Sequence, residues 1–167
     1  LLSIIDRERT GDFIHTFLLN YRQGGQLPMW ELSAYETWCM IGYHSVPVIL
    51  DAYLKGINDY NHIEMLQAMV ASARLPKLGR PEFEQYGFIP ADKEHESVSK
   101  TLEYAYDDFA IYQLAKALDR PKKEIKLYKE RSLNYKNLFD PETKLMRGKN
   151  KNGEFMAPFN PFKWGDA

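Results

Sequence analysis

The sequence has little that would support several common classes of function. Its 167 residues contain a single cysteine, Cys39, so no internal disulfide can form, and no cysteine and histidine cluster has zinc-site spacing. The 22 basic residues nearly balance the 23 acidic ones, which leaves no excess of positive charge for nucleic acid or an anionic membrane. No apolar run approaches the roughly 20 residues of a membrane span. Nucleophile-elbow and phosphate-loop motifs do not occur either.

The composition that remains is that of one globular domain. Hydrophobic residues make up 44% and aromatic residues 14%, which is enough for a core. We expect residues 1–167 to form one unit without an internal boundary. The chain opens on Leu1 without an initiator methionine and closes on an apolar segment at 161–167. These ends predict a piece of a longer protein.

Hydrophobic periodicity predicts an all-α fold, because no stretch alternates convincingly as a strand. Five helices are expected, at about 5–21, 45–56, 58–75, 97–118 and 121–138. Ser45 is a plausible N-cap for the second, and Gly56 a plausible stop. Ser97 or Ser99 is expected to cap the fourth.

The apolar patterns of these helices differ, and so do the links between them. Ile125, Tyr128, Tyr135 and Phe139 lie on one face of the last helix, as in a surface helix, whereas the second and fourth are apolar on two sides. Inner and outer helices therefore alternate. The long links, at 22–44, 73–96 and from 140 onward, all fall where inner helices begin. This predicts a double-layered helical ring with its site at that rim. An αα-solenoid is the alternative, although no repeat is visible.

The first long link contains GGQLPMWELSAYETWCMIGYHSVPV, residues 24–48, which is rich in aromatic and acidic side chains. Trp30 offers a flat apolar face, and Glu36 could bind hydroxyls or serve in acid–base chemistry. His44 precedes a helix and could be either a ligand or a structural histidine. Sugars combine apolar C–H faces with hydroxyls, so this mixture favours a carbohydrate site.

Two further clusters carry polar groups. Glu103, Asp107 and Asp108 lie close together on the fourth helix, with Lys100 partly offsetting Glu103. If that helix is an inner one, the carboxylates need partners such as an arginine or backbone N–H groups. The sequence leaves two interpretations of this carboxylate cluster open: a structural hydrogen-bond network and a functional site. Arg147, in the last long link, could anchor a carboxylate or a sugar hydroxyl, or be a surface arginine in a turn.

Three segments resemble successive parts of glycoside hydrolase family 92, the bacterial exo-acting α-mannosidases. They are GGQLPMWELSAYETWCMIGYHSVPVILDAYLKG, GFIPADKEHESVSKTLEYAYDDF and LFDPETKLMRGKNKNGEFMAPFNPF. The resemblance implies a β-sandwich followed by an (α/α)6 toroid, of which this chain would be about the first half. It also implies a calcium-dependent, inverting cleavage of α-linked mannose from glycans. Such enzymes are periplasmic or secreted.

The family's acid motif (Thr-Glu-Gly-Asn-like), base motif (Gly-Asn-Asp/Glu-Asp-like) and sugar-binding Trp-Asp-Thr-like motif do not occur here. The resemblance therefore places the acid, the base and most calcium ligands in other parts of the polypeptide, and no catalytic or metal residue is assigned within 1–167. Trp30, Glu36, His44 and Arg147 are the predicted substrate-binding residues. The alternatives are a non-enzymatic helical scaffold and another toroid carbohydrate enzyme, such as a lyase or an epimerase.

Overall fold

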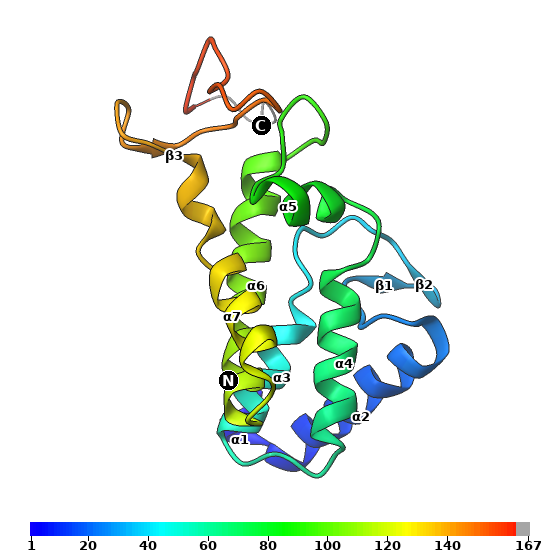
Figure 1. The fold of residues 1–167 in the computed structure, drawn as a ribbon. Helices are drawn as coiled ribbons and strands as arrows, with labels where there is room; N and C mark the ends of the chain where they lie inside the picture. Colours follow the sequence, from blue (N-terminus) through cyan, green and yellow to red (C-terminus); the bar gives the residue numbers. More distant parts are fainter. Residues whose placement is uncertain (163–167) are drawn as a thin grey trace.

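The computed structural model describes residues 1–162, and they are mostly helical (Figure 1). The α-helices are α1 Leu2–Ile5, α2 Arg7–Gly24, α3 Ser45–Leu54, α4 His62–Ala73, α5 Arg80–Tyr86, α6 Ser97–Ala117 and α7 Lys122–Arg131, followed by the 3-10 helix η1 Asn134–Leu138. Two antiparallel hairpins pair β1 Glu31–Leu32 with β2 Tyr35–Glu36, and β3 Phe139–Asp140 with β4 Leu145–Met146. Residues 163–167, predicted as part of an apolar closing segment, lie outside the described part.

All five predicted helices are present as α2, α3, α4, α6 and α7, the last continued by η1. The sequence analysis missed the four-residue helix α1, helix α5 and both hairpins. Helix α5 has only seven residues, set between Gly79 and Gly87, which both adopt the left-handed conformation. The hairpin strands are two residues long, so they are too short for alternation to appear.

The predicted serine caps are wrong. Ser45 is the first residue of α3, and its hydroxyl donates to the carbonyl oxygen of Pro28. Ser97 is the first residue of α6, after Glu96 with its φ of 54°, and within residues 1–162 its buried hydroxyl has no hydrogen-bond partner. Both serines therefore lie one position inside the helix.

The helices form two layers around a shared core. Helix α6 packs against α3, α4 and α7, while α2 packs against α3 and α4 (Figure 1). The largest apolar side chains that are fully buried come from these helices, from α5 and from the links: Ile14, Leu27, Tyr43, Ile49, Met65, Met69, Phe83, Ile89, Tyr104, Ile111 and Tyr128. Helices α3 and α6 are thus the inner ones and α2, α4 and α7 the outer ones, which confirms the predicted alternation.

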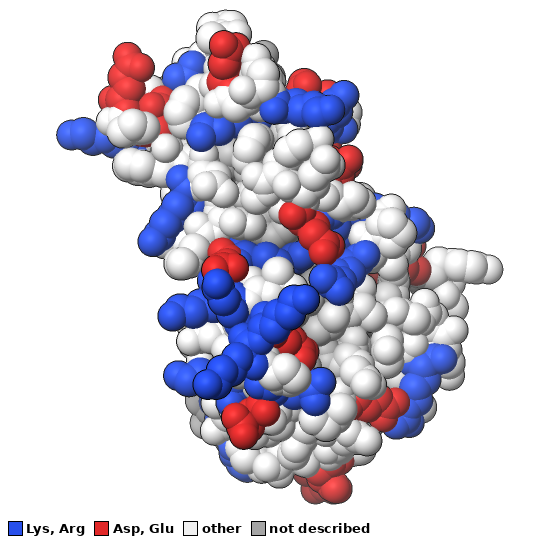
Figure 2. All heavy atoms as spheres, in the orientation of Figure 1, with Lys and Arg blue, Asp and Glu red and all other residues white. Residues whose placement is uncertain are grey.

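Helix α7 presents a charged outer face. Lysines gather along it (Figure 2), and those at 122, 123, 126 and 129 are exposed. On its other side Tyr128 is buried and Ile125 is partly buried, as predicted. Phe139 differs from the prediction because it lies in β3, beyond the helix, and is exposed.

The three long links meet on the side where α3 and α6 begin. The ammonium of Lys77 in the second link lies 4.1 Å from the ring centroid of Trp38 in the first. The backbone N–H of Ala91 in the second donates to the carbonyl of Lys149 in the third at 2.8 Å. The predicted common rim is therefore confirmed. Within residues 1–162, no helix has the length and hydrophobicity needed to cross a membrane.

Candidate carbohydrate site

The β1–β2 hairpin is held together by the Glu36 carboxylate. It accepts hydrogen bonds from the backbone N–H groups of Met29 at 2.8 Å, Trp30 at 3.1 Å and Trp38 at 3.2 Å. Trp30 itself remains 53% exposed. The oxygens of Glu36 are therefore already hydrogen-bonded within the hairpin. The hairpin leaves the Trp30 side chain exposed to solvent.

His44 lies against α6 at the start of α3. Its Nδ1 lies 2.9 Å from Oδ1 of Asp107, and its Nε2 lies 3.5 Å from Oε2 of Glu103. The hydrogen bond with Asp107 raises the pKa of His44 above its ordinary value, against the opposing effect of partial burial. The carboxylate of Asp107 is fully buried, whereas the imidazole is 41% exposed. Asp107 therefore holds the ring against α6 through Nδ1, and Nε2 lies near Glu103.

Asp107 and Asp108 anchor the end of the first long link to the helical core. Asp107 accepts the backbone N–H of Tyr43 at 2.6 Å, and Asp108 accepts the Tyr43 hydroxyl at 2.8 Å. Arg131 of α7 donates from Nε to Asp108 at 2.6 Å. Burial raises the pKa of Asp108 to about 6, with Arg131 and the Tyr43 hydroxyl opposing the rise. The predicted need for an arginine and a backbone N–H is confirmed.

Lys100 does not offset Glu103 as predicted. Its ammonium lies 2.7 Å from the carboxylate of Glu94, and the lysine is nearly buried. Glu103 is left facing His44, with 45% of its side chain exposed.

Arg80 is a second buried cation near the same link. It is only 2% exposed, and its guanidinium lies 5.0 Å from the ring centroid of Tyr43 and 5.4 Å from that of Tyr104. Its Nη2 also contacts the sulfur of Met29 at 3.3 Å. Cation–π contacts of this kind are strengthened by desolvation. Arg80 therefore packs the Met29–Tyr43 segment onto the start of α5.

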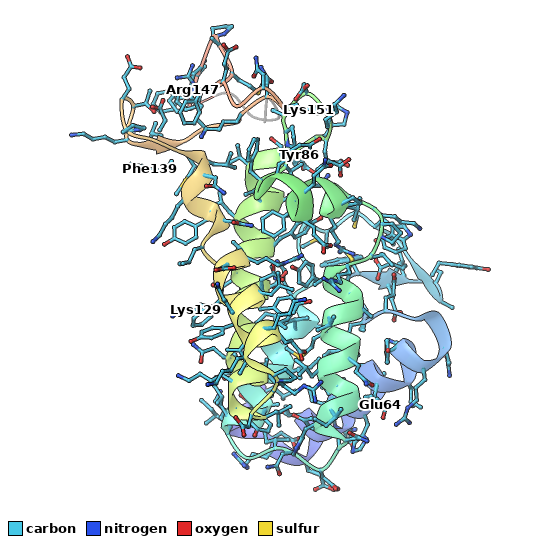
Figure 3. The ribbon with its side chains drawn as sticks, viewed as in Figure 1. Glu64, Tyr86, Lys129, Phe139, Arg147 and Lys151 are labelled. Atoms are coloured by element: carbon cyan, nitrogen blue, oxygen red, sulfur yellow. The ribbon has the colours of Figure 1, made fainter. Side chains whose placement is uncertain are left out.

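Arg147 organises the third long link (Figure 3). Its Nε and Nη2 donate to the carbonyl oxygen of Met156, at 2.8 and 2.5 Å, and its Nη1 lies 3.1 Å from the Asp140 carboxylate. The guanidinium also lies over the rings of Phe155 and Phe159. These contacts close the segment after β4 into a compact loop.

A groove of about 710 Å³ lies between α1, α2, α3 and the middle of α6. Its walls are mostly apolar, and His44, Asp51 and Tyr106 supply polar groups. Of the four predicted residues, Trp30 and Glu36 share one hairpin, His44 borders this groove, and Arg147 lies in the third link. Sequence analysis missed Tyr43, Arg80 and Arg131, because their partners are remote in sequence.

The described residues do not build a metal centre. Within 1–162, no group of three or more histidine, cysteine, aspartate or glutamate side chains is arranged to hold a metal ion. No step through calcium is therefore derived from the residues described.

Comparison with known proteins identifies the family. Residues 1–167 match the model of the glycosyl hydrolase family 92 catalytic domain. The chain belongs to this family. A secreted glycosidase of uncharacterised activity from Arthroderma benhamiae is 29% identical over 92% of the chain.

Solved structures agree with the fold. The GH92 α-mannosidase BT3965 of Bacteroides thetaiotaomicron, in complex with mannoimidazole, is 40% identical over 93% of the chain, with a TM-score of 0.89. The GH92 inverting mannosidase BT2199 of the same organism is 29% identical over 95%, with a TM-score of 0.90. The match covers 21% and 22% of those chains, and 22% of the Arthroderma protein. The chain thus spans about a fifth of the length of these relatives. The all-α fold, as part of a GH92 helical domain, is confirmed.

Proposed function

We propose that the protein containing this chain removes terminal α-linked mannose from glycans. The observation that carries the proposal is the 40% identity and 0.89 TM-score to an α-mannosidase in complex with mannoimidazole. The long links also favour it over a helical scaffold, for which short links and a regular repeat are expected. We place the general acid and base in parts of the polypeptide outside this chain, so residues 1–162 supply one wall of the sugar site.

Inversion and calcium dependence belong to the same proposal. Inversion is supported by the printed description of one relative and requires an acid, a base and a water between them. Calcium would be held mostly by residues in other parts of the polypeptide. The secreted description of the Arthroderma relative supports a secreted or periplasmic location. The partners we propose are a mannose-containing glycan and the rest of the polypeptide, a β-sandwich domain and the second half of the toroid.

Within this wall we assign Trp30 a stacking role, because its ring is exposed on a hairpin that Glu36 holds. Sugar contacts from Glu36 and Arg147 stay predictions, since their polar atoms already serve the hairpin and the third link.

The test uses the full-length protein and a panel of aryl glycosides. We expect hydrolysis of α-mannosides and not of β-mannosides or α-glucosides, with β-mannose as the first product seen by proton NMR. Chelation should abolish turnover and added calcium should restore it. Hydrolysis confined to non-mannosides would contradict the proposal, and α-mannose as first product would contradict inversion.

A further inference from the structure

Positive charge is concentrated in one short part of the chain. Residues 116–136, which cover the end of α6, all of α7 and most of η1, hold eight basic and three acidic residues, a net charge of +5. The other residues of the chain therefore carry a net charge of −6, because the whole sequence has a net charge of −1. The near balance of charge in the composition thus conceals a strong separation, and most of the positive part belongs to an outer helix.

Three lysines form a row along the exposed side of α7. Lys122, Lys126 and Lys129 are spaced by four and three residues, so they lie on one face of the helix. Tyr128 and Arg131 are buried on a different face. Lysines gather along this helix (Figure 2), and Lys129 lies at the outer edge of the molecule (Figure 3). The row therefore faces outward from the outer layer.

The acidic residues beside the row do not neutralise it. Glu124 is engaged by Arg120 at 3.3 Å, and Glu130 lies 3.7 Å from Lys126. The other two lysines of the row form no ion pair with any of the residues that the structure describes, 1–162. A lysine ammonium is a hydrated point charge on a flexible stem. Such groups fit a fluid anionic surface better than a fixed partner, for which the planar fork of arginine is the usual choice.

An apolar side chain continues the spacing of the row. Leu133 follows Lys129 by four residues, lies between α7 and η1, and is 44% exposed. Basic side chains next to exposed apolar ones are typical of helices that lie on an anionic membrane, where lysines reach the headgroups and the apolar group enters the acyl boundary. A dissolved anionic polymer has no apolar layer for the leucine. The surface therefore favours lipid over a polyanion.

We propose that Lys122, Lys126, Lys129 and Leu133 form a docking surface for an anionic phospholipid membrane, with α7 lying along the membrane surface. The inference goes beyond the proposed function and does not depend on it. The docking surface belongs to the outer layer, whereas the predicted sugar contacts lie in the long links at the rim. Docking therefore holds the protein at an anionic surface and leaves the rim free.

The first test measures binding of the full-length protein to lipid vesicles by co-sedimentation. One set of vesicles contains phosphatidylcholine with phosphatidylglycerol, and the other contains phosphatidylcholine alone. We expect wild type to bind only the anionic vesicles. The triple variant Lys122→Gln/Lys126→Gln/Lys129→Gln should bind them about a hundredfold more weakly, at roughly fivefold per lysine near the surface.

The matched control removes the same charge elsewhere. Lys93, Lys144 and Lys151 are exposed in the second and third long links, and replacing all three with glutamine should leave most of the vesicle binding in place. An equal loss in the two triple variants would show that overall charge governs binding and would overturn the docking surface. So would a wild-type protein that does not bind the anionic vesicles.

The second test decides between a membrane and a dissolved polyanion. Leu133→Asn should weaken vesicle binding about fivefold, because the exposed half of the leucine loses its apolar contact. Leu19→Asn is the matched control, since Leu19 is 48% exposed on the outer helix α2. Equal vesicle affinities for these two variants would refute the apolar contact. Binding of dextran sulfate by a wild type that ignores anionic vesicles would make the partner a polyanion, and the lipid assignment would be wrong.

A third measurement separates docking from folding and from the proposed function. The triple lysine variant should keep the wild-type denaturation midpoint and the wild-type kcat/KM on an aryl α-mannoside, because exposed charges contribute little to stability. If its midpoint falls, the single variant Lys129→Gln decides: about fivefold weaker vesicle binding supports the surface, and unchanged binding overturns it. Vesicle binding by a wild type that hydrolyses no α-mannoside would uphold the docking surface and contradict the proposed function alone.

Discussion

Asp107 and Asp108 are neighbours in sequence, yet they serve different parts of the molecule. Asp107 binds the backbone of Tyr43 and the ring of His44, on the side of α6 that meets the first long link. Asp108 binds the Tyr43 hydroxyl and Arg131, on the side that meets α7. Because adjacent helical positions point about 100° apart, one short stretch of α6 can hold both elements.

The Arg131–Asp108 pair yields a prediction about stability. Arg131→Met would leave the buried Asp108 carboxylate without its cation, and removal of one partner from a buried pair costs about 3–5 kcal/mol. The full-length protein should therefore unfold at clearly lower denaturant concentration. Lys126→Met is the control, because Lys126 and Glu130 form an exposed pair at 3.7 Å and such pairs contribute little. Equal midpoints for the two variants would contradict the prediction.

At the scale of elements, the junction before α3 determines where His44 lies. Gly42 has a φ of 90°, and a Cβ built there would lie 2.5 Å from the Cε1 and Nε2 atoms of His44. The turn therefore needs glycine both for its backbone and for the space that the imidazole occupies. The first long link is irregular, but the residues at its end, Gly42 to His44, have little freedom to change.

Gly42→Ala should accordingly disturb both stability and the His44 position. We expect a loss of about 1–3 kcal/mol from backbone strain, together with a higher KM as the imidazole is displaced. Gly24→Ala is the matched control, since a Cβ at Gly24 meets nothing within 4 Å. Denaturation and steady-state kinetics on the full-length protein measure the two effects. The prediction is wrong if Gly42→Ala matches Gly24→Ala in both.

Sequence patterns predicted the helices well, because amphipathic spacing is a local property that ten or more residues repeat. They could not predict α5, whose seven residues complete barely two turns between glycines. They located the segment around Trp30 and His44, but not the contacts that shape it. Tyr43 and Asp107 are 64 positions apart, and Arg131 and Asp108 are 23 apart, so these pairings arise only from tertiary packing.

At the scale of the molecule, the chain leaves apolar surface exposed on its inner helices. Apolar side chains on its inner helices, among them Val48, Tyr106 and Phe109, are substantially exposed. The chain also spans only about a fifth of the relatives it matches. Contiguous apolar surface of this kind is typical of an interface, and here the proposed cover is the remainder of the toroid.

The isolated 167-residue chain should therefore be inactive. We expect no turnover of an α-mannoside that the full-length protein hydrolyses, because the proposed acid and base lie elsewhere. Size-exclusion chromatography and circular dichroism on the same sample report whether it is folded and whether it self-associates. Turnover by a purified, contaminant-free sample would show that the acid and base lie within residues 1–167.

The neighbouring carboxylates Asp107 and Asp108 also fix the position of α6 along its axis relative to the first long link and α7. If α6 shifted by one residue, one aspartate would take the place of the other, and Tyr106 or Phe109 would fill the place that it left, so one set of partners would lose its carboxylate. We therefore expect insertions and deletions in homologous chains to accumulate in the outward parts of the long links. Between Ser97 and Asp108, and between Gly42 and His44, the number of residues should stay constant even where their identities drift.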